Sequence, residues 1–222
     1  MNKPQPSPPH AVLWDFGGVI LSSPFEAFNR YEQDAGLPKD FIRGLNTRNP
    51  DTNAWAKMER SEVSLQGFVD LFEAEALERG QKLDGWNVLR ILSGDIRPQM
   101  VEALRRCKAA GFRVACITNN MKTGEGPGMS RSPEKAKAVA EVMTLFEHVV
   151  ESSKFGFRKP DPRIYQYACK LVGVAPEHCI YLDDLGINLK PARALGMRTI
   201  KVDDPDVALA ELQEMVGIPL RG

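Results

Sequence analysis

Two acidic segments stand directly after apolar runs, in widely separated parts of the chain. Asp15 follows the run at residues 11–14, and Asp183 and Asp184 follow the run at residues 179–182. Such runs predict buried β-strands, and ligands bind at the carboxyl ends of parallel strands in α/β sheets. A carboxylate placed there can act as a nucleophile or bind a hard cation such as Mg²⁺. The two segments therefore predict one cation-binding site.

A third polar segment, beginning at Thr118 and Asn119, ends the apolar run at residues 112–117. The Thr118 hydroxyl and nearby backbone N–H groups are suited to bind the non-bridging oxygens of a phosphate. Taken alone, this segment is equally compatible with a turn that ends a strand. An isolated Asp15 or Asp184 would be better explained as a helix cap or turn residue. The recurrence of aspartate after two apolar strands favours a functional site.

The elements that must position these residues follow a regular order from Pro98 onward. Strands are predicted at residues 112–117, 148–150, 179–182 and 198–202, and helices at 98–110, 133–145, 187–195 and 206–216, with a further helix from about residue 161. This alternation predicts an α/β fold, a Rossmann-like doubly wound parallel sheet with helices on both faces.

Residues 24–97 show helical spacing of apolar residues and no convincing strand, which predicts a helical subdomain inserted after the first strand. The expected organisation is a core of residues 11–23 and 98–222, a helical cap of residues 24–97, and a mobile tail of residues 1–10. The tail is polar and carries four prolines. A Gly-rich connection is expected at residues 122–132.

Composition excludes several classes of protein. The chain has 29 Lys and Arg against 29 Asp and Glu, so it lacks the basic surface of a nucleic-acid binder. No run approaches the roughly 18 apolar residues of a membrane span. Four scattered cysteines without a C-x-x-C motif favour a reduced, cytoplasmic protein. The sequence leaves the oligomeric state open.

Four ordered motifs together resemble the haloacid dehalogenase (HAD) superfamily. They are Asp15 in Asp-Phe-Gly-Gly-Val, Thr118 in Ile-Thr-Asn-Asn, Lys159 in Arg-Lys-Pro-Asp-Pro-Arg-Ile-Tyr, and the Asp183-Asp184 pair. Residues 181–197 and the ending from Val202 resemble the N-terminal phosphatase-like domains of soluble epoxide hydrolase and acyl-CoA dehydrogenase family member ten. The resemblance covers about residues 11–220. It implies a Rossmann-like core, a helical cap after the first motif, Mg²⁺ dependence and hydrolysis of phosphate monoesters.

The resemblance also implies roles for individual residues. Asp15 would attack phosphorus and form an aspartyl-phosphate, Lys159 would supply a fixed positive charge, and Asp183 would orient Lys159 or a metal-bound water. Phosphate would bind at Thr118, Asn119, Gly17 and Gly18, and Mg²⁺ would bind at Asp15, Asp184 and the backbone carbonyl of Gly17.

The chain departs from the family pattern at Gly17. Most phosphatases of the family have a second aspartate there, which protonates the leaving oxygen and later deprotonates the attacking water. Three interpretations follow: a slow Mg²⁺-dependent phosphatase acting on a small phosphorylated substrate, a catalytically weak protein that binds a phosphorylated ligand or partner, or a non-phosphatase hydrolase such as a dehalogenase or phosphonate hydrolase. The Asp183-Asp184 pair favours a metal and disfavours a dehalogenase.

Overall fold

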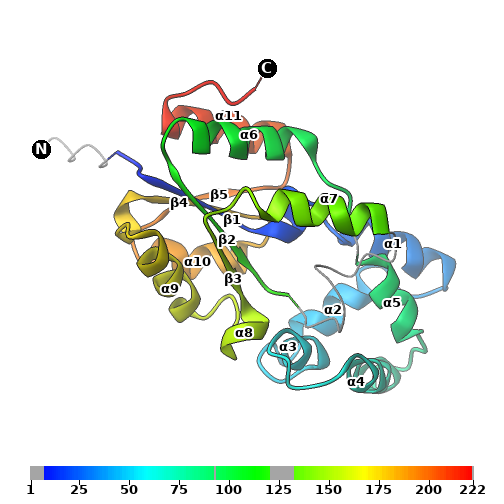
Figure 1. Ribbon diagram of the computed structural model, residues 1–222. Coiled ribbons are helices and arrows are strands. Elements are labelled where there is room, and N and C mark those ends of the chain that lie inside the picture. The colour runs from blue at the N-terminus through cyan, green and yellow to red at the C-terminus, as the bar shows by residue number, and fades with distance from the viewer. Residues whose placement is uncertain (1–7, 93, 121–132, 222) are drawn as a thin grey trace, which may run out of the picture.

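A single parallel sheet organises the chain in the computed structural model, which describes residues 8–92, 94–120 and 133–221 (Figure 1). Within these residues the sheet has five strands in the order β3-β2-β1-β4-β5. The strands are β1 Ala11–Trp14, β2 Arg113–Thr118, β3 His148–Glu151, β4 Cys179–Asp183 and β5 Arg198–Lys201. Because β1 pairs with both β2 and β4, the carboxyl ends of these three strands lie side by side.

Helices cover both faces of the sheet, as predicted for a doubly wound fold (Figure 1). All four residues of β1 are fully buried, and alternate side chains enter two hydrophobic clusters. Val12 and Trp14 pack with α6 Pro98–Ala109, α7 Pro133–Met143 and α11 Pro205–Val216. Ala11 and Leu13 pack with α9 Pro162–Val172 and α10 Gly186–Ala194. The sheet is thus held rigidly from both sides.

Five α-helices fill most of the described chain between the π-helical turn η1 Phe16–Ile20, which follows β1, and α6, and we call residues 25–91 the helical insert. They are α1 Phe25–Asp34, α2 Phe41–Thr47, α3 Ala54–Glu59, α4 Leu65–Leu77 and α5 Gly85–Ile91. The insert has its own hydrophobic cluster, with Phe28, Ile42, Phe68 and Phe72 at its centre. In Figure 1 these helices form a group apart from those that flank the sheet.

The two chain segments that connect the insert to the core lie side by side. Leu21 and Ile96 form an isolated antiparallel bridge, the Ser22 N–H donates to the Asp95 carbonyl at 2.7 Å, and the Arg97 N–H donates to the Ile20 carbonyl at 2.9 Å. The insert therefore enters and leaves the core at one place, next to the end of β1.

Predicted and observed elements differ mainly at their ends. The sequence did not predict the short helix α8 Ser152–Phe155 or the turn η2 Pro176–His178, which has too few residues to show a period. Residues 1–7 of the expected tail and the whole of the expected Gly-rich connection at residues 122–132 lie outside the described residues. His10 extends the pairing of β1, since its N–H donates to the His178 carbonyl at 2.8 Å. Among the described residues, no helix is both long and apolar enough to cross a membrane.

Candidate active site

Three carboxylates gather at the carboxyl ends of β1 and β4. Asp15, Asp183 and Asp184 each place an oxygen within 4.8 Å of the oxygens of the other two. Asp15 and Asp183 are buried, and Asp184 is partly buried. Because β1 and β4 are neighbours in the sheet, two segments 168 residues apart in sequence meet at one point. The sequence predicted this convergence.

Lys159 lies between two of these carboxylates. Its Nζ is 2.7 Å from Asp15 Oδ1 and 2.8 Å from Asp183 Oδ2, and the side chain is only 1% exposed. Burial disfavours the charged amine, but the carboxylates of Asp15 and Asp183 outweigh it and raise the pKa of Lys159. The ammonium therefore stays charged and fixes both carboxylates.

The Asp183 carboxylate is fully occupied by donors from the protein. Besides Lys159, it accepts bonds from the Leu185 N–H at 2.8 Å, from Asn188 Nδ2 at 3.0 Å and from the Tyr181 hydroxyl. Asp184, in contrast, accepts one side-chain bond from the described part of the chain, from Ser23 Oγ at 3.3 Å. This difference suits an orienting role for Asp183 and leaves the Asp184 oxygens more available to a cation.

From the sequence alone, Asn188 is equally compatible with steadying the loop after Asp183 and with lying near the start of the following helix. Tyr181 and Ser23 were not predicted at all. Asn188 is buried, and its carbonyl accepts a bond from the Tyr165 hydroxyl at 2.7 Å. Its position five residues after Asp183, in the first turn of α10, was the one available signal. Tyr181 reads in the sequence as an ordinary residue of an apolar strand.

The cluster carries more negative charge than Lys159 neutralises. Burial, followed by the charges of Asp183 and Asp184, raises the pKa of Asp15 against the opposing effect of Lys159. Burial and the nearby Asp183 raise the pKa of Asp184 to about 6. Three carboxylates beside one ammonium leave a net negative charge, which a divalent cation would offset. Carboxylate oxygens are the ligands that Mg²⁺ prefers, so the donor set fits this ion.

Gly17 and Gly18 differ in whether the structure has room for a side chain at their positions. Gly18 has φ +77°, and a Cβ atom there would lie 2.2 Å from Asp184 Oδ2, so a side chain would displace that carboxylate. Gly17 is exposed, with φ −71° and ψ 133°, and a Cβ atom there would meet no atom of the described residues within 4 Å. The fold therefore requires glycine at position 18 but not at position 17.

Thr118 and Asn119 lie at the end of β2, beside β1. The Thr118 side chain is buried with 7% exposure, and its role in phosphate binding stays a prediction. The Asn119 amide is engaged elsewhere: Oδ1 accepts from the Lys159 N–H at 2.8 Å, and Nδ2 donates to the Lys159 carbonyl at 3.1 Å and to Glu59 Oε2 at 3.2 Å. The sequence did not predict this contact with the helical insert.

Histidine does not take the place of the acid that Gly17 lacks. His10 precedes β1, His148 begins β3, and His178 precedes β4. All three histidines of the chain thus lie at the amino edge of the sheet, opposite the carboxylate cluster. An imidazole is therefore not positioned to protonate a leaving group at this site.

Comparison of the sequence with known proteins finds relatives that align with most of this chain. Acyl-CoA dehydrogenase family member 10 of Mus musculus is 32% identical over 216 residues, which cover 95% of this chain but 19% of that protein. Bifunctional epoxide hydrolase 2 of Sus scrofa is 29% identical over 221 residues, covering 95% of this chain and 39% of that protein. The chain thus spans well under half of these two relatives. A phosphatase of Mycobacterium tuberculosis is 34% identical over 205 residues, with 87% of both chains covered.

Solved structures share the fold at low sequence identity. A dehalogenase structure matches 95% of this chain and 98% of its own, with a TM-score of 0.66 and 19% identity. A HAD-family enzyme from Bacteroides thetaiotaomicron, solved with magnesium and inorganic phosphate, matches 87% and 93% with a TM-score of 0.54 and 17% identity. The family model described as haloacid dehalogenase-like hydrolase matches residues 9–196. The chain therefore belongs to the haloacid dehalogenase-like hydrolases.

Proposed function

We propose that the protein is a Mg²⁺-dependent phosphomonoesterase that acts through an aspartyl-phosphate on Asp15. The observation that carries this proposal is the placement of Lys159 against both Asp15 and Asp183, inside a cluster of three carboxylates. The relative from M. tuberculosis is named as a phosphatase, and the B. thetaiotaomicron enzyme was solved with magnesium and phosphate. Both support phosphate chemistry at this site.

Asp15 is arranged as a nucleophile. Its Oδ1 accepts bonds from the Phe16 N–H at 2.7 Å and from Lys159 at 2.7 Å, which fixes the plane of the carboxylate and leaves Oδ2 as the attacking oxygen. Attack forms a bond between Oδ2 and phosphorus and breaks the ester P–O bond. Water then hydrolyses the acyl phosphate, which restores Asp15 and releases inorganic phosphate.

Mg²⁺ would be held by Asp15, Asp184 and the backbone carbonyl of Gly17, and when bound it would neutralise charge on the phosphoryl oxygens. Lys159 would stabilise negative charge that develops on the phosphoryl group, because it is fixed and buried beside Asp15. Thr118 would donate its hydroxyl to a phosphoryl oxygen. Asp183 would keep Lys159 in place.

The absence of a carboxyl group at Gly17 determines which substrates turn over well. Because none of the three histidines lies near the site, we expect the leaving oxygen to depart as an anion or to take its proton from solvent water. Esters with good leaving groups should therefore react faster than alkyl phosphates. The same feature favours the second candidate, a protein that binds a phosphorylated ligand and turns it over poorly.

One assay separates these functions. Wild-type protein and the Asp15→Asn variant are incubated with p-nitrophenyl phosphate, acetyl phosphate and a panel of alkyl phosphates, with and without Mg²⁺. We expect Mg²⁺-dependent release of phosphate by the wild type alone. Release no greater than that of Asp15→Asn across the panel would refute the phosphatase proposal. Phosphate binding without turnover would support the binding function, and metal-independent halide release from 2-haloacids would support a dehalogenase.

A further inference from the structure

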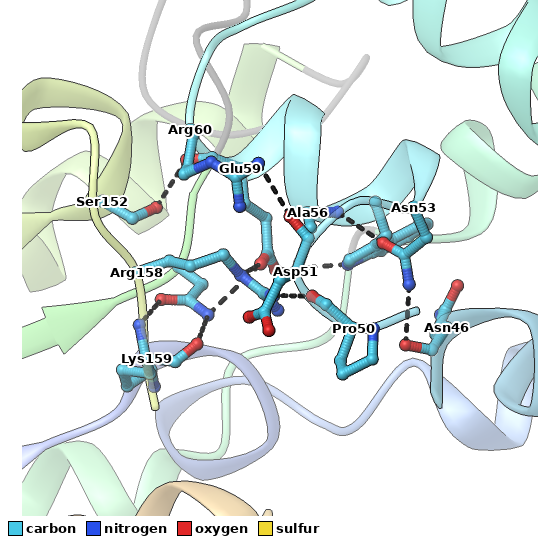
Figure 2. Close-up of polar contacts among 12 residues, drawn as sticks. Asn46, Pro50, Asp51, Asn53, Ala56, Glu59, Arg60, Ser152, Arg158 and Lys159 are labelled. Atoms are coloured by element: carbon cyan, nitrogen blue, oxygen red, sulfur yellow. Dashed lines mark hydrogen bonds and ion pairs between the residues drawn. The ribbon is translucent and has the colours of Figure 1, made fainter. Parts of the chain in front are cut away.

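Glu59, the last residue of α3 in the helical insert, directs its carboxylate at the core rather than at solvent. The residue is 8% exposed. Its Oε2 forms an ion pair with Arg158 Nε and accepts a hydrogen bond from Asn119 Nδ2 at 3.2 Å, and its Oε1 accepts from Trp55 Nε1 at 3.2 Å. Figure 2 shows Glu59 reaching from its helix toward Arg158 and Lys159.

Both core partners of Glu59 are directly connected to Lys159. Arg158 precedes Lys159 in the chain. The Asn119 side chain bonds to both polar groups of the Lys159 main chain: it accepts from the Lys159 N–H at 2.8 Å and donates to the Lys159 carbonyl at 3.1 Å. One side chain, Asn119, therefore connects the insert carboxylate to the backbone of the buried lysine.

The same contact region contains further bonds between insert and core. Ser152 Oγ donates to the Glu59 carbonyl at 2.8 Å, and Arg158 Nη1 donates to the Pro50 carbonyl at 2.9 Å. The Arg158 Nε–H does not point along the line to Glu59 Oε2, so that contact is an ion pair rather than a well-directed hydrogen bond. These bonds fix the end of α3 against the segment that carries Lys159 (Figure 2).

We propose that Glu59 is a positioning residue that couples the docking of the helical insert to the placement of Lys159. The proposal deepens the proposed function, because it relies on Lys159 being the catalytic lysine. Lys159 Nζ contacts Asp15 at 2.7 Å and Asp183 at 2.8 Å, so a small backbone shift lengthens one of the two contacts. Displacement of about 1 Å at such a site lowers the rate by up to roughly 10²-fold.

Docking of the insert thus completes the site. When α3 moves away, the Asn119 amide loses its Glu59 acceptor and Arg158 loses its carboxylate partner. Both groups are then free to find other partners, and the main chain of Lys159 loses part of its support. The insert affects the phosphoryl-transfer step through this link.

Glu59→Gln tests the proposal, because it removes the charge and keeps the shape. We expect kcat for p-nitrophenyl phosphate to fall by about tenfold with KM nearly unchanged, and the Lys159 amide to exchange hydrogen for deuterium faster. The matched control is Glu32→Gln. Glu32 is a buried carboxylate that accepts from the Asp40 and Ile42 N–H groups inside the insert, both at 2.8 Å. It contacts no core residue through these bonds, so both readouts should stay at the wild-type level.

Equal losses of kcat in the two variants, or an unchanged exchange rate at Lys159 in Glu59→Gln, would overturn the proposal. Should Glu59→Gln fail to fold, Glu59→Asp keeps the charge and withdraws the carboxylate by one methylene, and it is read in the same way. Absence of turnover in the wild type would refute the proposed function only. The exchange measurement would still decide whether Glu59 supports Lys159.

Discussion

Replacing Gly17 with aspartate would place a carboxyl group two residues after the proposed nucleophile. The position is exposed, with φ −71° and ψ 133°, which any L-residue adopts, and a Cβ atom there meets no atom within 4 Å. Replacing glycine at a compatible position contributes roughly 0.4–1 kcal/mol of stability, by restricting the unfolded chain. Repulsion from Asp15 and Asp184 opposes this gain. We therefore expect the melting temperature of Gly17→Asp to stay close to that of the wild type.

The expected gain in rate depends on the leaving group. A well-placed general acid contributes about 10²–10⁴-fold. An aspartate added to an open position has no partner that fixes its side chain, so we expect the lower end, about 10²-fold in kcat for an alkyl phosphate. That gain corresponds to about 2.7 kcal/mol of barrier. For p-nitrophenyl phosphate, whose phenolate departs without protonation, we expect less than about tenfold.

The assay compares kcat across phosphate esters of graded leaving-group acidity, with Mg²⁺ present. The wild-type rate should depend steeply on leaving-group acidity, and the rate of Gly17→Asp should depend on it weakly. Gly17→Asn is the matched control, because asparagine has the same shape and cannot transfer a proton. A gain that Gly17→Asn reproduces would mean that the side chain acts by binding or packing. No gain on alkyl phosphates in a folded Gly17→Asp variant would refute the missing-acid account.

Three further predictions concern the carboxylate cluster. Gly18→Ala should abolish turnover and lower the melting temperature, because it requires φ +77° of alanine and places Cβ 2.2 Å from Asp184 Oδ2; full activity would contradict this packing. Lys159→Met should lower the unfolding free energy by about 3–5 kcal/mol in urea titrations, since Asp15 and Asp183 lose their buried partner. Without metal, the pKa of Asp184 is raised from its ordinary value of 3.8 to about 6, so the folded state binds more protons than the unfolded state between these values. The contribution of Asp184 to the unfolding free energy should fall by at most roughly 3 kcal/mol as pH rises across that window, and Asp184→Asn should remove this contribution.

The sequence predicted the architecture because its strongest signals were strands. Three apolar runs followed by polar residues, at residues 11–14, 112–117 and 179–182, identified the strands that bring the site together, and the parallel order follows from the helices between the strands. The convergence of Asp15 with Asp183 and Asp184 needed no more than that order. Lys159 was found through the family motif, since a lysine before a proline has no distinctive signal of its own.

Contacts between the helical insert and the core could not be predicted in this way. Glu59 meets Asn119 and Arg158 across 60 and 99 residues of sequence, and its position depends on how α3 packs within the insert. Local patterns report whether a residue is on a helix, but not which distant loop its side chain meets. The hydrogen bonds of the Asn119 side-chain amide could not be predicted for the same reason.

The energetics of the cluster argue against a purely structural role. Buried carboxylates are costly unless each is paired and hydrogen-bonded, and a well-packed apolar group is often more stable in such a place. Asp183 meets that requirement through four donors, whereas Asp184 has a raised pKa and, within residues 8–92, 94–120 and 133–221, one side-chain bond at 3.3 Å. A group left in this condition destabilises the ligand-free fold, and the cation of the proposed function would compensate its charge. Position 17 has no such constraint, because glycine there is required by no contact. Under the proposed function, glycine at position 17 would alter the proton-transfer step and leave the proposed cation- and phosphate-binding residues in place. For this reason leaving-group dependence separates a slow phosphatase from a protein that only binds.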